Sequence, residues 1–221
     1  MNNLQIIAHR GASGNCGDNN IISIKKAIEI GCSIIEIDIR LTSDNILVLY
    51  HDSEITINNK KYIIEKSIYN DVSEKVCTLE KILEISPKNL LYYLDIKVLD
   101  NKKKFTKYLV SFLKKYTNRT FILASFDKTF IGNFPLLNNI KFGIISEKYD
   151  PEEINSYLSK ISYLILDINY IQNLDIKKIK NYLCNKKIYL YTVNIKNELL
   201  PYLDLIDGIV TDYPNEFLIK A

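Results

Sequence analysis

Apolar residues recur along this chain in short continuous runs, separated by segments in which they return every three or four positions. The continuous runs predict strands at 5–9, 33–40, 90–97, 120–125, 141–146, 163–169, 187–193 and 208–211. The segments between them predict helices at 21–30, 78–85, 103–116, 128–137, 151–158, 175–184, 196–203 and 215–219. Asp127 and Asp150 each precede a predicted helix, as expected of residues that cap a helix N-terminus.

Strands and helices alternate regularly, and the spacing indicates the fold class. Eight pairs in 221 residues amount to about 28 residues per unit (221/8), which favours a single-domain (β/α)₈ TIM barrel over residues 1–221. A doubly wound open sheet is the alternative fold. The rhythm is broken between 47 and 76, where a short strand at 47–50 and the pair Asn58-Asn59 predict a short insertion, at about 52–76, in the form of a hairpin or lid.

Polar residues lie where the predicted strands end, which is where (β/α)₈ barrels carry their catalytic groups. His9 ends the first strand, and Glu36 and Asp38 in the second are two residues apart, so they point to one face. Asp95 and Lys97 repeat this spacing in the third strand. A carboxylate in a buried strand costs free energy unless it is paired or bound to a metal. Together these residues predict a divalent-metal site.

Each of these residues also has a purely structural interpretation. His9 alone would be a core histidine, and Asp95 with Lys97 would be a buried ion pair. The second of the two histidines, His51, is followed by Asp52 and ends another apolar run. Two histidines beside a carboxylate-held cation supply a general base, a general acid and charge neutralisation, which displacement at a phosphodiester requires.

Composition and charge narrow the class of protein. With 47% hydrophobic and 25% charged residues, the chain is expected to fold around a globular core. Its 29 Lys and Arg residues against 26 Asp and Glu are spread along the chain, which argues against nucleic acid as a partner. We expect a cytoplasmic protein without a membrane span, because no signal peptide pattern and no run of about 20 apolar residues is present. The oligomeric state is not indicated.

Several motifs, taken in order, resemble the glycerophosphodiester phosphodiesterases. They are AHRGASG at 8–14, Asp18-Asn19, EID at 36–38, LTSD at 41–44, His51-Asp52, TLEKIL at 78–83, LDIK at 94–97, SFD at 125–127, YTVN at 191–194 and DGIVTDYP at 207–214. The resemblance covers nearly the whole chain. It implies a metal-dependent (β/α)₈ phosphodiesterase.

The resemblance also implies roles for individual residues. His9 and His51 would be the catalytic pair, while Arg10 and Lys97 would bind phosphate. The implied metal ligands are Glu36, Asp38 and Asp95, holding one divalent cation, Mg²⁺ or Ca²⁺, with Mn²⁺ as a further candidate. Candidate supporting residues are Asp18, Asn19 and Asp52. Phe126 and Tyr191 are candidates for an apolar wall against the substrate alcohol, although core packing is the default for a residue as common here as tyrosine.

Three departures from the family pattern concern the same site. The family usually has Glu-Asn-Thr where this chain has Asp18-Asn19-Asn20, and Glu where this chain has Asp95. Both acids are therefore one methylene shorter. In addition, 25 residues separate His51 from Cys77, where the family commonly inserts a longer region. We therefore expect the mouth of the barrel to be more open than is usual in the family.

The function predicted from these observations is hydrolysis of a small phosphodiester. The substrate would be glycerophosphodiester-like, and the products a phosphomonoester resembling sn-glycerol 3-phosphate and an alcohol. One alternative is a lyase-type phosphodiesterase that releases a cyclic phosphate, since either water or a substrate hydroxyl can attack. Another is a catalytically quiet barrel that binds a phosphate ligand.

Overall fold

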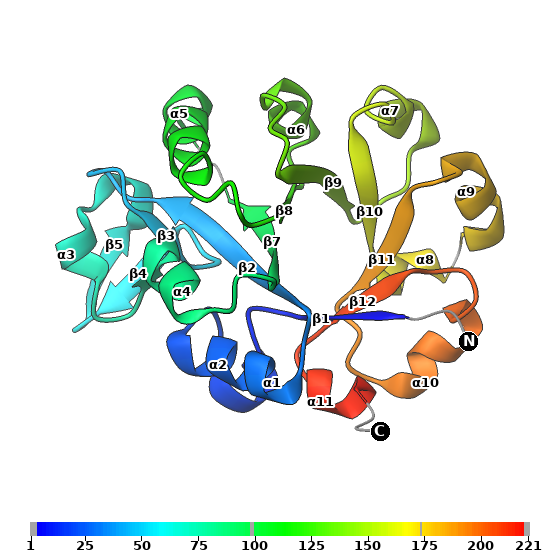
Figure 1. Ribbon diagram of the computed structural model, residues 1–221, viewed down its shortest axis with the longest axis horizontal. Coiled ribbons are helices and arrows are strands. Elements are labelled where there is room, and N and C mark those ends of the chain that lie inside the picture. The colour runs from blue at the N-terminus through cyan, green and yellow to red at the C-terminus, as the bar shows by residue number, and fades with distance from the viewer. Residues whose placement is uncertain (1–3, 98–99, 173, 219–221) are drawn as a thin grey trace.

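Eight parallel strands close into a barrel in the computed structural model, which describes residues 4–97, 100–172 and 174–218. Around the ring they are β1 (Gln5–Ala8), β2 (Ile34–Leu41), β7 (Leu91–Ile96), β8 (Phe121–Ser125), β9 (Ile140–Ser146), β10 (Ile161–Asp167), β11 (Lys187–Tyr191) and β12 (Gly208–Thr211). The sheet closes because β1 pairs in parallel with both β2 and β12 (Figure 1). The predicted single-domain barrel is confirmed, and the open sheet is excluded.

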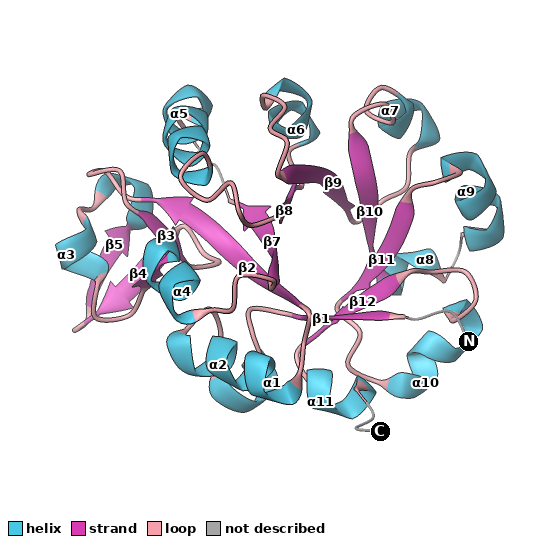
Figure 2. Cartoon of the chain, in the orientation of Figure 1, coloured by secondary structure: helices cyan, strands magenta, loops and turns pink. Residues whose placement is uncertain are grey.

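Helices surround the barrel, as Figure 2 shows. Those that match the predicted ones are α2 (Ile21–Ile30), α4 (Leu79–Ile85), α5 (Lys102–Leu113), α6 (Lys128–Asn133), α7 (Pro151–Asn155), α9 (Ile176–Leu183), α10 (Lys196–Leu199) and α11 (Pro214–Phe217). The helix predicted to reach 137 ends at Asn133, because Phe134 precedes Pro135 and takes up the extended backbone that proline favours there. Position 219, the predicted end of the last helix, lies outside the described residues.

The structure also contains short helices that the sequence pattern did not predict. They are α1 (Ser13–Cys16), η1 (Ile64–Lys66), α3 (Tyr69–Val72) and α8 (Ile168–Ile171), whereas η2 (Leu200–Tyr202) follows α10 directly and lies within the helix predicted at 196–203. One of them shortens a predicted strand: β10 ends at Asp167, whose side chain accepts a hydrogen bond from the backbone N–H of Asn169 and so caps α8. Elements of three or four residues are too short to show a helical period.

Alternation along the strands separates an apolar outer face from an inner face that changes character along the barrel. In β2, Ile35, Ile37 and Ile39 pack in the core beneath the helices, so the residues between them face inward. The barrel interior beneath the C-terminal strand ends is filled by a cluster of apolar and tyrosine side chains, namely Ile7, Ile34, Tyr93, Ile122, Ala124, Ile145, Tyr163, Ile165, Tyr189 and Val210. Beyond this apolar layer, toward the C-terminal ends of β2 and β7, the inward-facing positions carry Glu36, Asp38 and Asp95.

The insertion after β2 forms a small unit beside the barrel. β3 (Leu47–Leu49) pairs antiparallel with β2 and with β6 (Cys77–Thr78), while β4 (Glu54–Ile57) and β5 (Lys60–Ile63) form a separate hairpin. Asn58 and Asn59 make its turn with φ angles of 49° and 62°, the left-handed conformation that such turns require. Figure 1 shows β4 and β5 outside the ring of barrel strands, so of the two predicted forms the hairpin is the correct one.

The described ranges contain no helix with the length and apolar character needed to cross a membrane.

A capping box begins α2, next to the site described below. The Asn20 side chain accepts hydrogen bonds from the backbone N–H groups of Ile22 and Ser23 at 2.8 and 2.9 Å, and the Ser23 hydroxyl accepts one from the backbone N–H of Asn20. We expect Asn20→Ala to lower the free energy of unfolding by about 1 kcal/mol, and Asn20→Thr to lower it by less. Urea unfolding followed by circular dichroism measures both. Equal stability of Asn20→Ala and the wild type would show that the cap does not stabilise α2.

Candidate active site

A cavity of about 130 Å³ lies at the C-terminal ends of the strands and gathers the residues singled out in the sequence. Its lining includes His9, Arg10, Glu36, Asp38, His51, Asp95, Lys97, Phe126 and Tyr191. These residues come from β2, β7 and β11 and from the loops after β1, β3, β7 and β8. Segments up to 182 residues apart in sequence (191 − 9) thus meet at one place.

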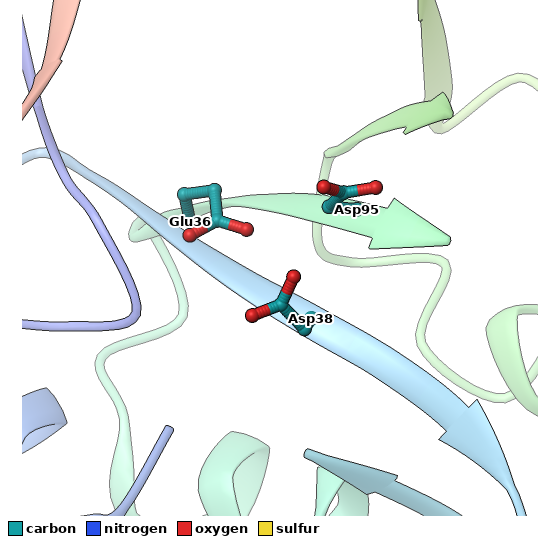
Figure 3. Close-up of side chains that lie close together, drawn as sticks. All are labelled: Glu36, Asp38 and Asp95. Atoms are coloured by element: carbon teal, nitrogen blue, oxygen red, sulfur yellow. The ribbon is translucent and has the colours of Figure 1, made fainter. Parts of the chain in front are cut away.

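Three carboxylates form the floor of the cavity. Glu36 and Asp38 lie on the inner face of β2, and Asp95 lies beside Asp38 on β7, since these two residues are partners in the parallel register. One oxygen from each of the three residues lies within 4.8 Å of the others, and their residues are 3%, 1% and 6% exposed. Figure 3 shows the three side chains facing a common space between the two strands.

The turn after β1 delivers a backbone N–H group to this cluster. Arg10 has a φ angle of +54°, and Gly11 follows with +85°. A β-carbon on Gly11 would lie 2.6 Å from Ser23, so this position requires glycine. The turn directs the Arg10 N–H to Glu36, to which it donates a hydrogen bond of 2.8 Å.

The Asp38 carboxylate is in contact with the charged groups of Lys97 and Arg10 and with the side-chain amide of Asn19. Lys97 Nζ lies 3.3 Å from Asp38 Oδ1, and Arg10 Nε lies 3.1 Å from Asp38 Oδ2 as an ion pair without hydrogen-bond geometry. Asn19 both donates to the carboxylate at 2.8 Å and accepts from the Asp38 backbone N–H at 3.1 Å. Burial alone would raise the pKa of Asp38, but the charges of Lys97 and Arg10 outweigh it and hold the pKa below its usual value. Asp38 is therefore ionised at neutral pH.

Glu36 and Asp95 are less well neutralised. Burial, together with the charges of Asp38 and Asp95, raises the pKa of Glu36 well above its usual value. Burial and Asp38 also raise the pKa of Asp95 to about 6, although Lys97 Nζ lies 2.7 Å from its Oδ2. The other oxygen, Asp95 Oδ1, is buried and has no hydrogen-bond partner among the described residues.

This donor set fits a hard divalent cation. The carboxylates of Glu36, Asp38 and Asp95 offer oxygen atoms, which Mg²⁺ and Ca²⁺ prefer, and ligands about 2.0–2.6 Å from one ion lie at mutual separations like those of the three residues. The unpaired Asp95 Oδ1 provides a ligand atom that no protein group occupies. The residues present are thus suited to hold a cation.

His9 is oriented by a carboxylate that the sequence analysis did not single out. His9 Nδ1 lies 2.6 Å from Asp212 Oδ1, which leaves Nε2 on the side of Glu36, 4.0 Å from Oε2. Ser13 donates to the same Asp212 oxygen at 2.9 Å, and Asn194 donates to the other at 2.6 Å. These hydrogen bonds outweigh partial burial and lower the pKa of Asp212 to about 2. Asp212 thus remains an anion beside the imidazole.

A signal for Asp212 was present in the sequence. It directly follows β12, the last barrel strand, within the DGIVTDYP motif, and therefore occupies the same kind of position as His9 and Lys97. What the sequence did not show is that β12 is the neighbour of β1, which brings Asp212 to His9.

His51, Asp18 and Asp52 lie closer to solvent, whereas Asn19 is buried. The His51 side chain is 44% exposed, and its Nδ1 lies 2.8 Å from Oδ1 of the exposed Asp52. Asp18 accepts a hydrogen bond of 2.6 Å from Arg10 Nη1. Asp18 thus contacts Arg10 and Asp52 contacts His51, while Asn19 contacts both Asp38 and the Arg10 carbonyl.

Phe126 and Tyr191 form one side of the cavity. Their rings meet edge to face with centroids 6.0 Å apart, and Lys97 Nζ lies 5.2 Å from the Phe126 ring centroid. The Tyr191 hydroxyl is buried, has no hydrogen-bond partner in the part of the chain that the structure describes, and has a pKa raised by burial. Phe126 is 42% exposed, so it does not belong to the core.

Comparison with known proteins points to one family. The sequence model of the Glycerophosphoryl diester phosphodiesterase family matches residues 9–216. A glycerophosphodiester phosphodiesterase of Caldanaerobacter subterraneus is 26% identical, with 96% of each chain covered. Another, from Bacillus subtilis, is 24% identical over 96% of this chain and 84% of the relative.

Solved structures share the fold. A glycerophosphodiester phosphodiesterase from Thermotoga maritima superimposes with a TM-score of 0.85 at 20% identity, covering 98% of both chains. A phosphodiesterase from Oleispira antarctica, in complex with the product sn-glycerol-3-phosphate, superimposes with a TM-score of 0.84 at 20% identity, covering 96% of this chain and 94% of the other.

The raised pKa values in the acidic cluster predict how cation binding depends on pH. Protons on Asp95 and Glu36 compete with the cation, so the affinity for Mg²⁺ should rise with pH by about tenfold per unit for each proton displaced, and this dependence should weaken above about 6, where Asp95 has lost its proton. Isothermal titration calorimetry between pH 5 and 8, in buffers of different ionisation enthalpy, measures the affinity and the protons released. An affinity independent of pH would contradict this protonation of the cluster.

Proposed function

The chain belongs to the glycerophosphoryl diester phosphodiesterase family and is a phosphoric diester hydrolase, and from this premise we propose how its cavity works. In this proposal a divalent cation and the histidines His9 and His51 cleave a small glycerophosphodiester with water. The products are a phosphomonoester, sn-glycerol 3-phosphate or a close analogue, and an alcohol. The observation that carries the proposal is the convergence of three buried carboxylates, two cations and two histidines in one cavity.

Glu36, Asp38 and Asp95 would hold the cation, Mg²⁺, Ca²⁺ or Mn²⁺, since they form the described oxygen cluster. When bound, the cation neutralises negative charge that develops on the phosphoryl oxygens and lowers the pKa of a water molecule. Asp95 has a shorter side chain than the glutamate that is usual at this position. One of its carboxylate oxygens nevertheless belongs to the cluster, which supports a role as a ligand.

Arg10 and Lys97 would bind the phosphate. Lys97 Nζ contacts two carboxylates and has a third N–H group for an anion, while Arg10 carries two further N–H groups on Nη2. Their charges already compensate the carboxylates in the resting site. A bound phosphodiester therefore meets fixed donors, which costs little reorganisation.

His9 would act as the general base. Asp212 fixes the orientation of the ring through Nδ1 and stabilises the positive charge that the ring acquires when Nε2 takes a proton. The proton comes from the attacking hydroxyl, either that of water or that of the substrate next to the phosphate. In the second case a cyclic phosphate forms first, and water opens it in a second step.

His51 would act as the general acid. It lies on the exposed side of the cavity, where a departing alcohol can leave to solvent after it takes a proton from the ring. Phe126 and Tyr191 would contact the alcohol or glycerol part, and the buried Tyr191 hydroxyl offers it a hydrogen bond. The expected cytoplasmic location stays a prediction.

The test is a panel of glycerophosphodiesters that differ in the alcohol, followed by ³¹P NMR. We expect formation of a phosphomonoester that stops with excess chelator and resumes with Mg²⁺, Mn²⁺ or Ca²⁺. A cyclic phosphate that appears and then decays would identify the substrate hydroxyl as the first nucleophile. Full activity in excess chelator would refute the role given to the cation.

Replacement of either histidine by alanine should lower kcat by about 10²–10⁴-fold, the usual contribution of positioned acid–base catalysis. Cation affinity should change little, because neither ring belongs to the oxygen cluster. Steady-state kinetics and calorimetric titration of the same preparations measure the two effects. A variant that keeps wild-type kcat but melts at a lower temperature would show that the histidine is structural.

A further inference from the structure

We propose that Arg40, which the family comparison and the predicted site leave unassigned, is a positioning residue that holds His51 in place. The inference rests on the proposed function, because it concerns the histidine that would act as general acid. Arg40 follows Glu36 and Asp38 on the inner face of β2 and is 5% exposed. The side chain therefore extends from the barrel wall and not from a loop.

Its guanidinium joins three segments around the cavity. Arg40 Nε and Nη2 both donate to the backbone carbonyl of His51, at 3.0 and 2.6 Å. Nη1 donates to Glu65 Oε1 at 2.5 Å and, at 3.3 Å, to the backbone carbonyl of Lys97. Two of these four hydrogen bonds thus go to the backbone of His51.

This anchor matters because the His51 side chain has little else to restrain it. The ring is 44% exposed, and its partner Asp52 is an adjacent residue that is itself 71% exposed, so that contact moves with the loop. A forked pair of hydrogen bonds from a rigid strand restricts both the position and the direction of the His51 carbonyl. Loss of the fork would displace the ring, and a shift of about 1 Å in a catalytic group can cost about 10²-fold in rate.

Glu65, from the insertion, completes the arrangement. It supplies a negative charge to the buried guanidinium, and its side chain is 17% exposed. Among the described lining residues, His51 alone comes from the stretch 47–76. Glu65 therefore acts on the cavity only indirectly, through its contact with Arg40.

The chain offers a matched control in Arg119. This arginine is 6% exposed and donates to the backbone carbonyls of Leu83, Ser86 and Pro87 at 2.7–2.8 Å. The loop that it holds leads into the N-terminal end of β7, at the end of the barrel opposite the cavity. Arg40 and Arg119 are thus two buried arginines that bind loop carbonyls, and they differ in which end of the barrel they serve.

The experiment compares Arg40→Met, Arg40→Lys, Glu65→Gln and Arg119→Met with the wild type, and combines Arg40→Met with His51→Ala. We expect Arg40→Met to lower kcat at least about tenfold with KM changed less than about twofold. Arg40→Lys should keep more of the thermal stability than Arg40→Met but not recover kcat, because lysine lacks the fork. Arg119→Met should lower stability and leave kcat unchanged. In the His51→Ala background, Arg40→Met should lower kcat by less than about twofold, since it acts through the missing ring.

The outcomes separate this inference from the proposed function. A wild-type enzyme without activity on any glycerophosphodiester would refute the proposed function. An active wild type, with Arg40→Met affecting stability but not kcat as Arg119→Met does, would overturn the role of Arg40 alone. The role of Arg40 would also be overturned if Arg40→Met lowered kcat by the same factor in the wild-type and His51→Ala backgrounds. If Arg40→Met does not fold, Arg40→Lys and Glu65→Gln decide: wild-type kcat in both refutes the inference.

Discussion

The carboxylates of Glu36, Asp38 and Asp95 are buried together with the positive charges of Arg10 and Lys97. The balance between these opposite charges determines the properties of the site. Both cations neutralise Asp38, so Glu36 and one oxygen of Asp95 keep charge that burial makes costly. The result is opposite pKa changes in neighbouring groups, downward for Asp38 and upward for Glu36 and Asp95. A cluster of this kind is stable either with bound protons or with a bound cation.

The rigid barrel strands hold the three carboxylates close together despite the repulsion between their charges. Neighbouring parallel strands set Asp38 beside Asp95, and the apolar packing of the lower interior supports the floor of the cavity. The loops then add His9, Arg10, His51 and Lys97, the groups to which we assign proton transfer and phosphate binding in the proposed function. The left-handed turn at Arg10 brings a backbone N–H to Glu36.

The two histidines are held in different ways. His9 lies at the end of a strand and is oriented through its ring by Asp212, which Ser13 and Asn194 hold in turn. His51 lies in a loop, and the structure restrains its backbone through Arg40. A ring that is 18% exposed and fixed by a carboxylate matches the proposed base, and a ring that is 44% exposed and held through its main chain matches the proposed acid.

The sequence by itself determined the barrel and most of the residues in its mouth, because both follow from local periods. Alternation placed Glu36 and Asp38 on one face, and the strand count predicted closure. Only the tertiary structure decided the contacts between residues that lie apart in sequence. Asp212 reaches His9 only because β12 pairs with β1, and Arg40 reaches His51 only because β3 folds back along β2. The charge state of Asp95 was likewise undetermined, since burial and the distances to Asp38 and Lys97 set its pKa, and no local pattern encodes those distances.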